Sequence, residues 1–196
     1  MVALLKTPSV MTVVEFLAWD APAGQRWQLV DGEPRSMAPA SRTHNILQGA
    51  LGTALTNHFD ALGSPCVVVP TPGVVPRARS QDNYRIPDLA VTCTGYDAEE
   101  YALSEPVLLV EILSPSNLAE TWTNIWAYMT IPSVREILVL RSTSIGAEVL
   151  RRAPDGTWPD RPIVVTDGVL VLESIGFRVE LAGLYRRTRL AGKGDA

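Results

Sequence analysis

Two acidic residues lie in or beside apolar, strand-like segments of this chain. Asp88 follows Pro87 and opens the run Leu89–Cys93, whereas Glu111 lies inside the run 107–113. Burying an unpaired carboxylate costs several kcal/mol, so Glu111 needs a cation, a hydrogen-bond network or solvent beside it. If the two segments are neighbouring strands, Asp88 can lie beside Glu111, and bound Mg²⁺ or Mn²⁺ would relieve their repulsion. The two acids therefore indicate a candidate metal site.

An arginine offers a second explanation for a buried glutamate. Arg85, Arg135 or Arg141 could neutralise Glu111 with no metal present. The residues alone leave the metal site and the arginine pair open.

The segments before Asp88 predict helices and a hairpin. Thr12 can cap a short helix, with Glu15 placed to close a capping box. Asp31-Gly32 suits a two-residue turn between strands at 27–30 and 33–37. Ser41 or Thr43 can cap a long helix whose apolar positions recur as far as residue 62.

The segments around and after Glu111 predict a mixed sheet. Residues 66–69, interrupted afterwards by Pro70 and Pro72, suit an edge strand, and 89–93, 107–113 and 136–140 read as buried central strands. A helix ending at Tyr128 separates the last two strands, which predicts a parallel crossover. Further strands at 147–151, 163–165 and 169–172 precede a short helix at 181–187.

Length and composition favour one soluble α/β unit. The 196 residues are 46% apolar and 19% charged, and no apolar run approaches the roughly 20 residues that span a bilayer. We expect a tail at 1–10, a single domain at 11–187, a tail at 188–196 and a cytoplasmic location. Cys66 and Cys93 show no metal or redox spacing and read as buried free thiols.

The charge of the chain limits how it could contact nucleic acid. A net charge of −4 argues against a broad basic surface, so any DNA contact would be local. Lysine occurs only at Lys6 and Lys193, and the rest of the 17 basic residues are arginines. The basic segment 186–189 suits a solvated terminal face better than a nucleic-acid arm.

Several motifs, taken in this order, resemble one protein family. They are Asp31-Gly32-Glu33, Pro87-Asp88, Val110-Glu111-Ile112-Leu113-Ser114-Pro115-Ser116, a helix ending in Tyr128, and Val134-Arg135-Glu136-Ile137-Leu138-Val139. The chain resembles the Uma-two restriction endonuclease family from about Met11 to Leu181. That family is placed in the PD-(D/E)XK nuclease superfamily, so the resemblance implies a restriction-endonuclease-like α/β fold, a central mixed β-sheet flanked by helices.

The resemblance also implies a site and an activity. Asp88 and Glu111 stand where the superfamily binds Mg²⁺ (or Mn²⁺), and the main-chain carbonyl of Ile112 would complete the protein ligands. Glu33 and His44 match polar positions of the family pattern, although a solvated strand-end Glu and a capping or core His explain them equally well. The implied reaction is metal-dependent hydrolysis of nucleic acid, DNA being favoured, and a homodimer is plausible because duplex cleavage commonly uses two active sites.

The chain departs from the family where a lysine is expected. Leu113 occupies the superfamily's lysine position, and Asn124 occupies the position that the Uma-two pattern uses instead. Asn124 can orient water or a phosphate oxygen but brings no charge. Glu120, Asn124 and Tyr128 share one helix face at i, i+4 and i+8, which would line the site if that face meets Glu111. The alternatives to a nuclease are a catalytically impaired nuclease-fold module that acts in binding, and a structural or oligomerisation domain with an arginine paired to Glu111.

Overall fold

The computed structural model describes residues 10–97, 99–114 and 118–191. The first nine residues of the predicted N-terminal tail, Pro115 and Ser116 of the family motif, and both lysines lie outside this part of the chain.

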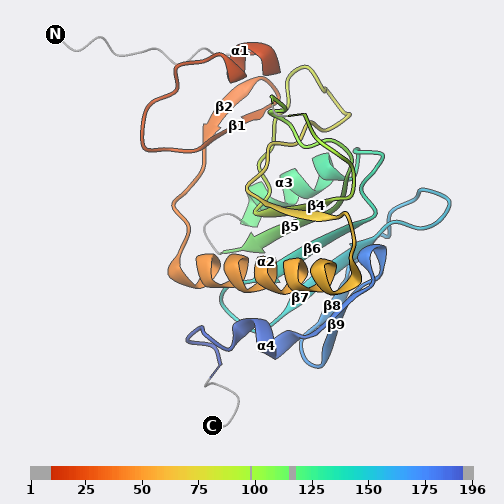
Figure 1. The fold of residues 1–196 in the computed structure, drawn as a ribbon. Coiled ribbons are helices and arrows are strands. Elements are labelled where there is room, and N and C mark those ends of the chain that lie inside the picture. Colours follow the sequence, from red (N-terminus) through yellow and green to blue (C-terminus); the bar gives the residue numbers. More distant parts are fainter. Residues whose placement is uncertain (1–9, 98, 115–117, 192–196) are drawn as a thin grey trace.

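A six-stranded mixed sheet forms the centre of the molecule (Figure 1). Its strands lie in sequence order, with β3 and β8 at the edges, and all neighbours are antiparallel except β5 and β6. The predicted edge strand and the predicted parallel crossover are therefore confirmed. The strands are β3 (Val67–Pro70), β4 (Leu89–Thr92), β5 (Pro106–Leu113), β6 (Glu136–Arg141), β7 (Ala147–Arg151) and β8 (Ile163–Val165).

Helices cover both faces of this sheet because its central strands are apolar on both sides. α2 (Arg42–Leu62) and α4 (Leu181–Tyr185) lie on one face, and α3 (Leu118–Tyr128) lies on the other (Figure 1). On β5, Leu108, Val110 and Ile112 pack toward α2, whereas Leu109 packs toward α3. Glu111, which alternates with the first set, therefore faces α3.

A second antiparallel pair, β9 (Val169–Leu172) and β10 (Phe177–Glu180), packs into the core on the α2 side. The 3₁₀ helix η1 (Glu173–Ile175) joins the two strands. The core continues into residues that were predicted to begin the C-terminal tail, since Thr188 and Leu190 are buried. We therefore propose that the domain extends to Leu190.

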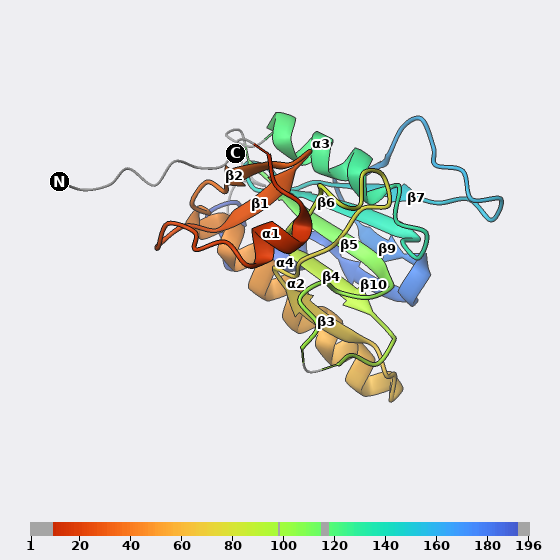
Figure 2. The ribbon, with the colours of Figure 1, turned by 90° about the horizontal axis from the view of Figure 1, so that it is seen from above.

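The N-terminal elements form a small unit near α3, seen from above in Figure 2. α1 (Val13–Leu17) has the predicted capping box between Thr12 and Glu15. β1 (Trp27–Val30) and β2 (Glu33–Ser36) form the predicted hairpin, in which Asp31 and Gly32 both have positive φ. Two main-chain hydrogen bonds between Leu29 and Tyr84 attach this hairpin to the segment that leads to Asp88.

The prediction of two free thiols is wrong, because Cys66 and Cys93 form a disulfide. The strand register explains the pairing. Val67 lies opposite Thr92 in the antiparallel β3–β4 pair, so Cys66, which precedes Val67, faces Cys93, which follows Thr92.

No helix within the described ranges is long and apolar enough to cross a membrane.

Candidate metal and catalytic site

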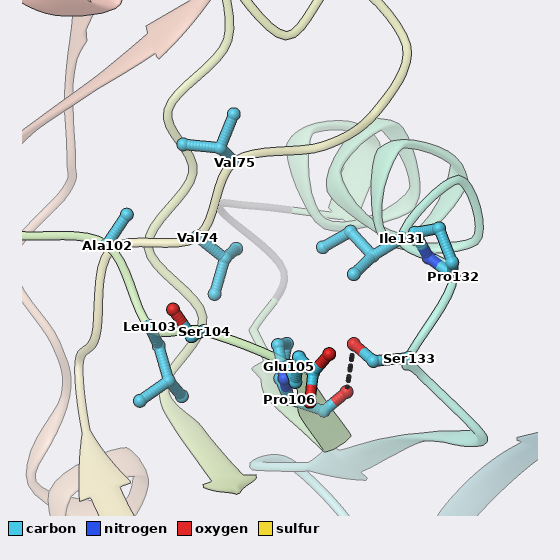
Figure 3. Close-up of a pocket in the computed structure, with 10 residues that line it drawn as sticks. All are labelled: Val74, Val75, Ala102, Leu103, Ser104, Glu105, Pro106, Ile131, Pro132 and Ser133. Atoms are coloured by element: carbon cyan, nitrogen blue, oxygen red, sulfur yellow. Dashed lines mark hydrogen bonds between the residues drawn. The ribbon is translucent and has the colours of Figure 1, made fainter. Parts of the chain in front are cut away.

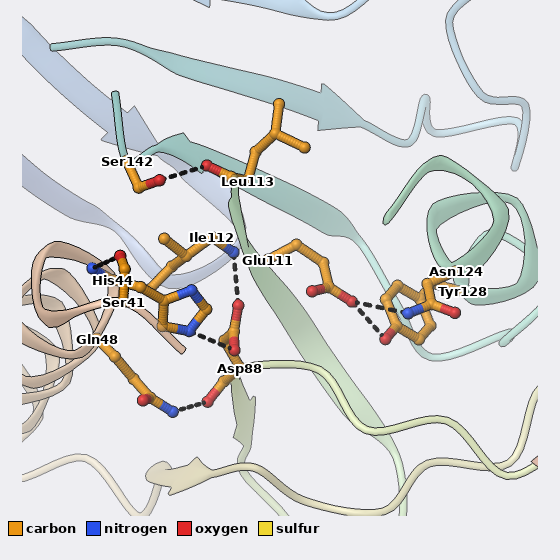
Figure 4. A network of polar contacts seen from close by, with 10 residues as sticks. All are labelled: Ser41, His44, Gln48, Asp88, Glu111, Ile112, Leu113, Asn124, Tyr128 and Ser142. Atoms are coloured by element: carbon orange, nitrogen blue, oxygen red, sulfur yellow. Dashed lines mark hydrogen bonds and ion pairs between the residues drawn. The ribbon is translucent and has the colours of Figure 1, made fainter. Parts of the chain in front are cut away.

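The antiparallel pairing of β4 and β5 brings Asp88 and Glu111 to the same end of the sheet. Leu89, the first residue of β4, lies opposite Val110, and the main-chain N–H of Asp88 donates to the Val110 carbonyl at 3.0 Å. Near the end of β5, the Asp88 carboxylate turns toward α2 and the Glu111 carboxylate turns toward α3 (Figure 4). The expectation that these strands are neighbours is confirmed, whereas a role for either acid in metal binding stays a prediction.

Both carboxylate oxygens of Asp88 are held in place. Oδ1 lies 2.9 Å from Nε2 of His44, and Oδ2 accepts a hydrogen bond from the Ile112 main-chain N–H at 2.6 Å (Figure 4). Gln48 also donates to the main-chain carbonyl of Asp88 at 2.7 Å. The Asp88 side chain is therefore oriented from α2 on one side and from β5 on the other.

His44 reaches Asp88 because of the way that α2 begins. Ser41 is the N-cap, and its hydroxyl oxygen accepts a hydrogen bond from the His44 main-chain N–H at 3.2 Å. This places His44 in the first turn, where the residue is 7% exposed and its ring points to Asp88. The cap at Ser41 thus places the His44 ring in contact with the Asp88 carboxylate.

Glu111 is buried against α3 without an ion pair. Its Oε1 accepts hydrogen bonds from the Tyr128 hydroxyl at 2.7 Å and from Asn124 Nδ2 at 3.4 Å (Figure 4). No arginine in the described ranges lies within ion-pair distance of Glu111, and Arg141 pairs with Glu148 instead. The alternative of a direct arginine pair is therefore wrong for this glutamate.

The surroundings of Glu111 disfavour its negative charge. Burial raises the pKa of the Glu111 carboxyl well above its usual range, and the charge of Asp88 raises it further, while hydrogen bonds from Tyr128 and Asn124 oppose the shift. Burial and the charge of Glu111 likewise raise the pKa of the Tyr128 phenol, so its hydroxyl remains a donor. A cation beside the two carboxylates would relieve this repulsion.

The oxygen donors at this end of the sheet match those that Mg²⁺ and Mn²⁺ prefer. Asp88 and Glu111 supply two carboxylates. The Ile112 N–H points to Asp88, and in an extended strand the carbonyl of the same residue points to the same edge. Among the described residues no group of three or more His, Cys, Asp or Glu side chains forms a metal cluster. Further ligands would be main-chain carbonyl and water oxygens.

The predicted polar face of α3 meets the site through two of its three residues. Asn124 and Tyr128 are buried and contact Glu111, whereas Glu120 accepts a hydrogen bond from Gln28 at 2.5 Å. Glu33 is not brought to the carboxylates in the described structure. It is exposed on β2, and its carboxylate pairs with Arg35 at 3.2 Å.

Gln48 has no place in the sequence predictions, whereas Tyr128 appears there as part of a polar helix face and Arg85 as a possible ion-pair partner of Glu111. Gln48 lies one turn after His44 on α2, a spacing that places both on the side of Asp88. Arg85 donates to Asn124 Oδ1 at 2.8 Å, a contact across 39 residues of sequence. The helical spacing could have identified Gln48, whereas no local signal indicates the partner of Arg85.

Two hollows differ in their distance from the buried carboxylates. One of about 350 Å³ is lined by Val74, Leu103, Ser133 and neighbours at the start of β5, opposite the end that carries Glu111 (Figure 3). A larger groove of about 630 Å³ runs between α2 and β3 and includes Gln48 and Leu89, which flank Asp88. The second groove is thus the one next to the candidate site.

Comparisons with known proteins agree with this architecture. Residues 13–182 match the model of the Uma2 family, described as "Putative restriction endonuclease". An uncharacterized Synechocystis protein, slr1290, is 29% identical over 174 residues, which cover 88% of this chain and 90% of that protein. A crystal structure of a "putative nuclease belonging to DUF820" from Anabaena variabilis superposes with a TM-score of 0.70 at 14% identity, covering 89% of this chain and 97% of the other. The predicted restriction-endonuclease-like α/β class is confirmed.

Proposed function

This chain belongs to the Uma2 family, and from that membership and the paired acids we propose that it is a metal-dependent endonuclease that hydrolyses phosphodiester bonds of nucleic acid, with DNA favoured. The observation that carries the proposal is the pair formed by Asp88 and Glu111 at the end of β5. Asp88 is held by two hydrogen-bonding groups, and Glu111 is buried with no ion pair to a basic residue of the described ranges. Two acidic groups in this arrangement suit a bound cation better than a core that holds no ion.

The residues divide the work as follows. Asp88, Glu111 and the Ile112 carbonyl would hold Mg²⁺ (or Mn²⁺), which when bound polarises a phosphate and activates a water. His44 and Gln48 orient Asp88 from α2. Tyr128 and Asn124 orient Glu111 from α3, and the second N–H of the Asn124 amide can hold a water or a phosphate oxygen.

Cleavage of plasmid DNA tests the proposal. Purified protein should nick or linearise supercoiled plasmid with Mg²⁺ or Mn²⁺ and stop when EDTA is added, while Asp88→Asn and Glu111→Gln should lower the rate by about 10²-fold or more. Asp155→Asn, in an exposed turn far along the chain, is the matched control and should retain wild-type activity. Equal cleavage by Asp88→Asn would exclude the assignment.

A catalytically impaired binding module is the second candidate, and Asn124 favours it. The position that carries lysine in the family pattern holds a neutral amide, and the described ranges contain no lysine. This candidate predicts Mn²⁺ binding by calorimetry without turnover on DNA or RNA. Measurable metal-dependent turnover would remove it.

The remaining proposals concern assembly and location. Cutting both strands of a duplex commonly uses two active sites, so we propose a homodimer, which light scattering at working concentration would detect. We also propose that the enzyme acts in the cytoplasm. Fractionation of cells would place it there or elsewhere.

A further inference from the structure

Arg85 is a buried cation whose hydrogen-bond partners among the described residues are neutral amides. The residue is 3% exposed. Nη1 donates to Asn124 Oδ1 at 2.8 Å, Nη2 donates to Asn83 Oδ1 at 2.8 Å, and Nε has no partner in the described structure. No carboxylate in the described ranges forms an ion pair with it. A buried charge without a counter-ion is costly, so its presence calls for a reason beyond packing.

The contact with Asn124 determines which way the amide faces. A guanidinium can only donate, so Asn124 must present its carbonyl oxygen to Arg85. The amide nitrogen then points to the other side, where it donates to Glu111 Oε1 at 3.4 Å. The result is a chain of donors from Arg85 through Asn124 to Glu111, and in such a chain each hydrogen bond polarises the next.

The guanidinium is itself held from the N-terminal hairpin. Asn83 Oδ1, which accepts from Arg85, also accepts from the main-chain N–H of Asp31 at 3.0 Å. Asn83 Nδ2 donates to the Asp31 carboxylate at 3.1 Å. Arg85 therefore connects two fixed amides, those of Asn83 and Asn124. A planar guanidinium can hold both at once, whereas a lysine ammonium on a flexible side chain does so less well.

We propose that Arg85 is a positioning residue that turns the Asn124 amide toward Glu111 and brings, through that amide, the positive charge that position 124 lacks. This inference rests on the proposed nuclease function and extends it. The pair formed by Arg85 and Asn124 takes the place of one lysine. Asn124 provides the N–H next to the reacting groups, and Arg85 provides the charge behind it.

Three variants and one control test the pair. Arg85→Met removes the charge at similar length, Asn124→Lys places an ammonium directly beside Glu111, and the double variant combines them. Arg152→Met is the control, because Arg152 also bridges two oxygen acceptors, the carbonyls of Gly156 and Pro132, but lies far from the site in the fold. Each protein is assayed for plasmid cleavage, for Mn²⁺ affinity by calorimetry and for its unfolding midpoint by circular dichroism.

The proposal predicts a split between cleavage and metal binding. Arg85→Met should cleave about 10- to 100-fold more slowly, the loss typical of one charge-assisted hydrogen bond, while its Mn²⁺ affinity stays within about threefold of wild type or becomes tighter. Asn124→Lys in the Arg85→Met background should restore most of the lost rate. Arg152→Met should change neither rate nor affinity, even where its unfolding midpoint falls.

Other outcomes overturn the proposal. Unchanged cleavage by Arg85→Met, loss of Mn²⁺ affinity in parallel with cleavage, or no recovery in the double variant each assigns Arg85 a purely structural role. If Arg85→Met does not fold, Arg85→Lys carries the same test, since it keeps the charge but loses the fork, and it should show a smaller loss of rate. Failure of the nuclease function itself is distinct, because wild-type protein would then show no metal-dependent cleavage, and the inference would fall with it.

Discussion

The hydroxyl of Tyr128 donates a 2.7 Å hydrogen bond to Oε1 of Glu111, and this bond connects the last turn of α3 to β5 near the end of that strand. Both residues are buried, the hydrogen bond from Tyr128 lowers the pKa of Glu111 against the effect of burial, and the charge of Glu111 raises the pKa of the Tyr128 phenol. The bond holds the carboxylate in one orientation without neutralising it. Glu111 is therefore oriented but remains available to a cation.

Removal of this hydroxyl should weaken the fold. Tyr128→Phe leaves Glu111 with one fewer donor, and we expect the free energy of unfolding to fall by about 1–3 kcal/mol at neutral pH, the usual cost of losing a hydrogen bond to a charged group. Urea titration measures it. Tyr185→Phe is the matched control, since the Tyr185 hydroxyl donates to main-chain carbonyls and its loss should cost about 1 kcal/mol. An equal or smaller loss for Tyr128→Phe would contradict the assignment.

Glu111→Gln should stabilise the metal-free protein at neutral pH. The pKa of Glu111 is raised in the folded state, so the folded protein holds this proton more tightly than the unfolded chain does, and wild-type stability falls as pH rises above the unfolded pKa of about 4.5. Glutamine does not titrate but can still accept both hydrogen bonds. The advantage of Glu111→Gln should therefore be absent near pH 4 and grow above it, by about 1.4 kcal/mol for each unit of raised pKa.

Denaturant titrations at several pH values, in EDTA, check this prediction. Glu148→Gln serves as the control, because Glu148 is also a strand glutamate at the edge of the core but pairs with Arg141 at 2.6 Å. Its replacement should lower stability at neutral pH. A Glu111→Gln protein that is less stable than wild type at pH 7 without metal would show that the carboxylate is not strained.

Local patterns were sufficient to predict the parts of the site that depend on strand order and helix spacing. Asp88 and Glu111 lie on consecutive apolar strands, and Asn124 and Tyr128 are four residues apart on one helix, so their meeting follows from regular geometry. The partner of Arg85 could not be predicted in this way, because Arg85 lies in the segment between β3 and β4, outside the strands of the central sheet. Its direction is set by the packing of the hairpin against that segment.

The disulfide illustrates the same limit. Cys66 and Cys93 flank two strands, but their pairing depends on the β3–β4 register, in which Val67 lies opposite Thr92, and this register is not visible in composition. We expect Ellman titration of denatured, unreduced protein to find no free thiol. The Cys66→Ser/Cys93→Ser double variant should lose about 3–4 kcal/mol of stability, the chain-entropy value for a loop of this length. Two titratable thiols in protein purified without reductant would contradict the pairing.

Divalent metal should stabilise the folded protein through the two carboxylates. A ligand that binds only the native state at one hundred times its dissociation constant adds about 2.7 kcal/mol, so saturating Mn²⁺ should raise the unfolding midpoint of wild-type protein measurably. Asp88→Asn and Glu111→Gln should each remove this shift, because each leaves one carboxylate. Asp155→Asn should retain it, since Asp155 lies in an exposed turn and bonds only to Thr157 in the described structure.

The effect of Glu111→Gln on stability should change sign when metal is added. This variant should be more stable than wild type in EDTA and less stable in saturating Mn²⁺. A structural domain with no metal site predicts the same order of stabilities in both solutions, so a single pair of melting curves distinguishes the two.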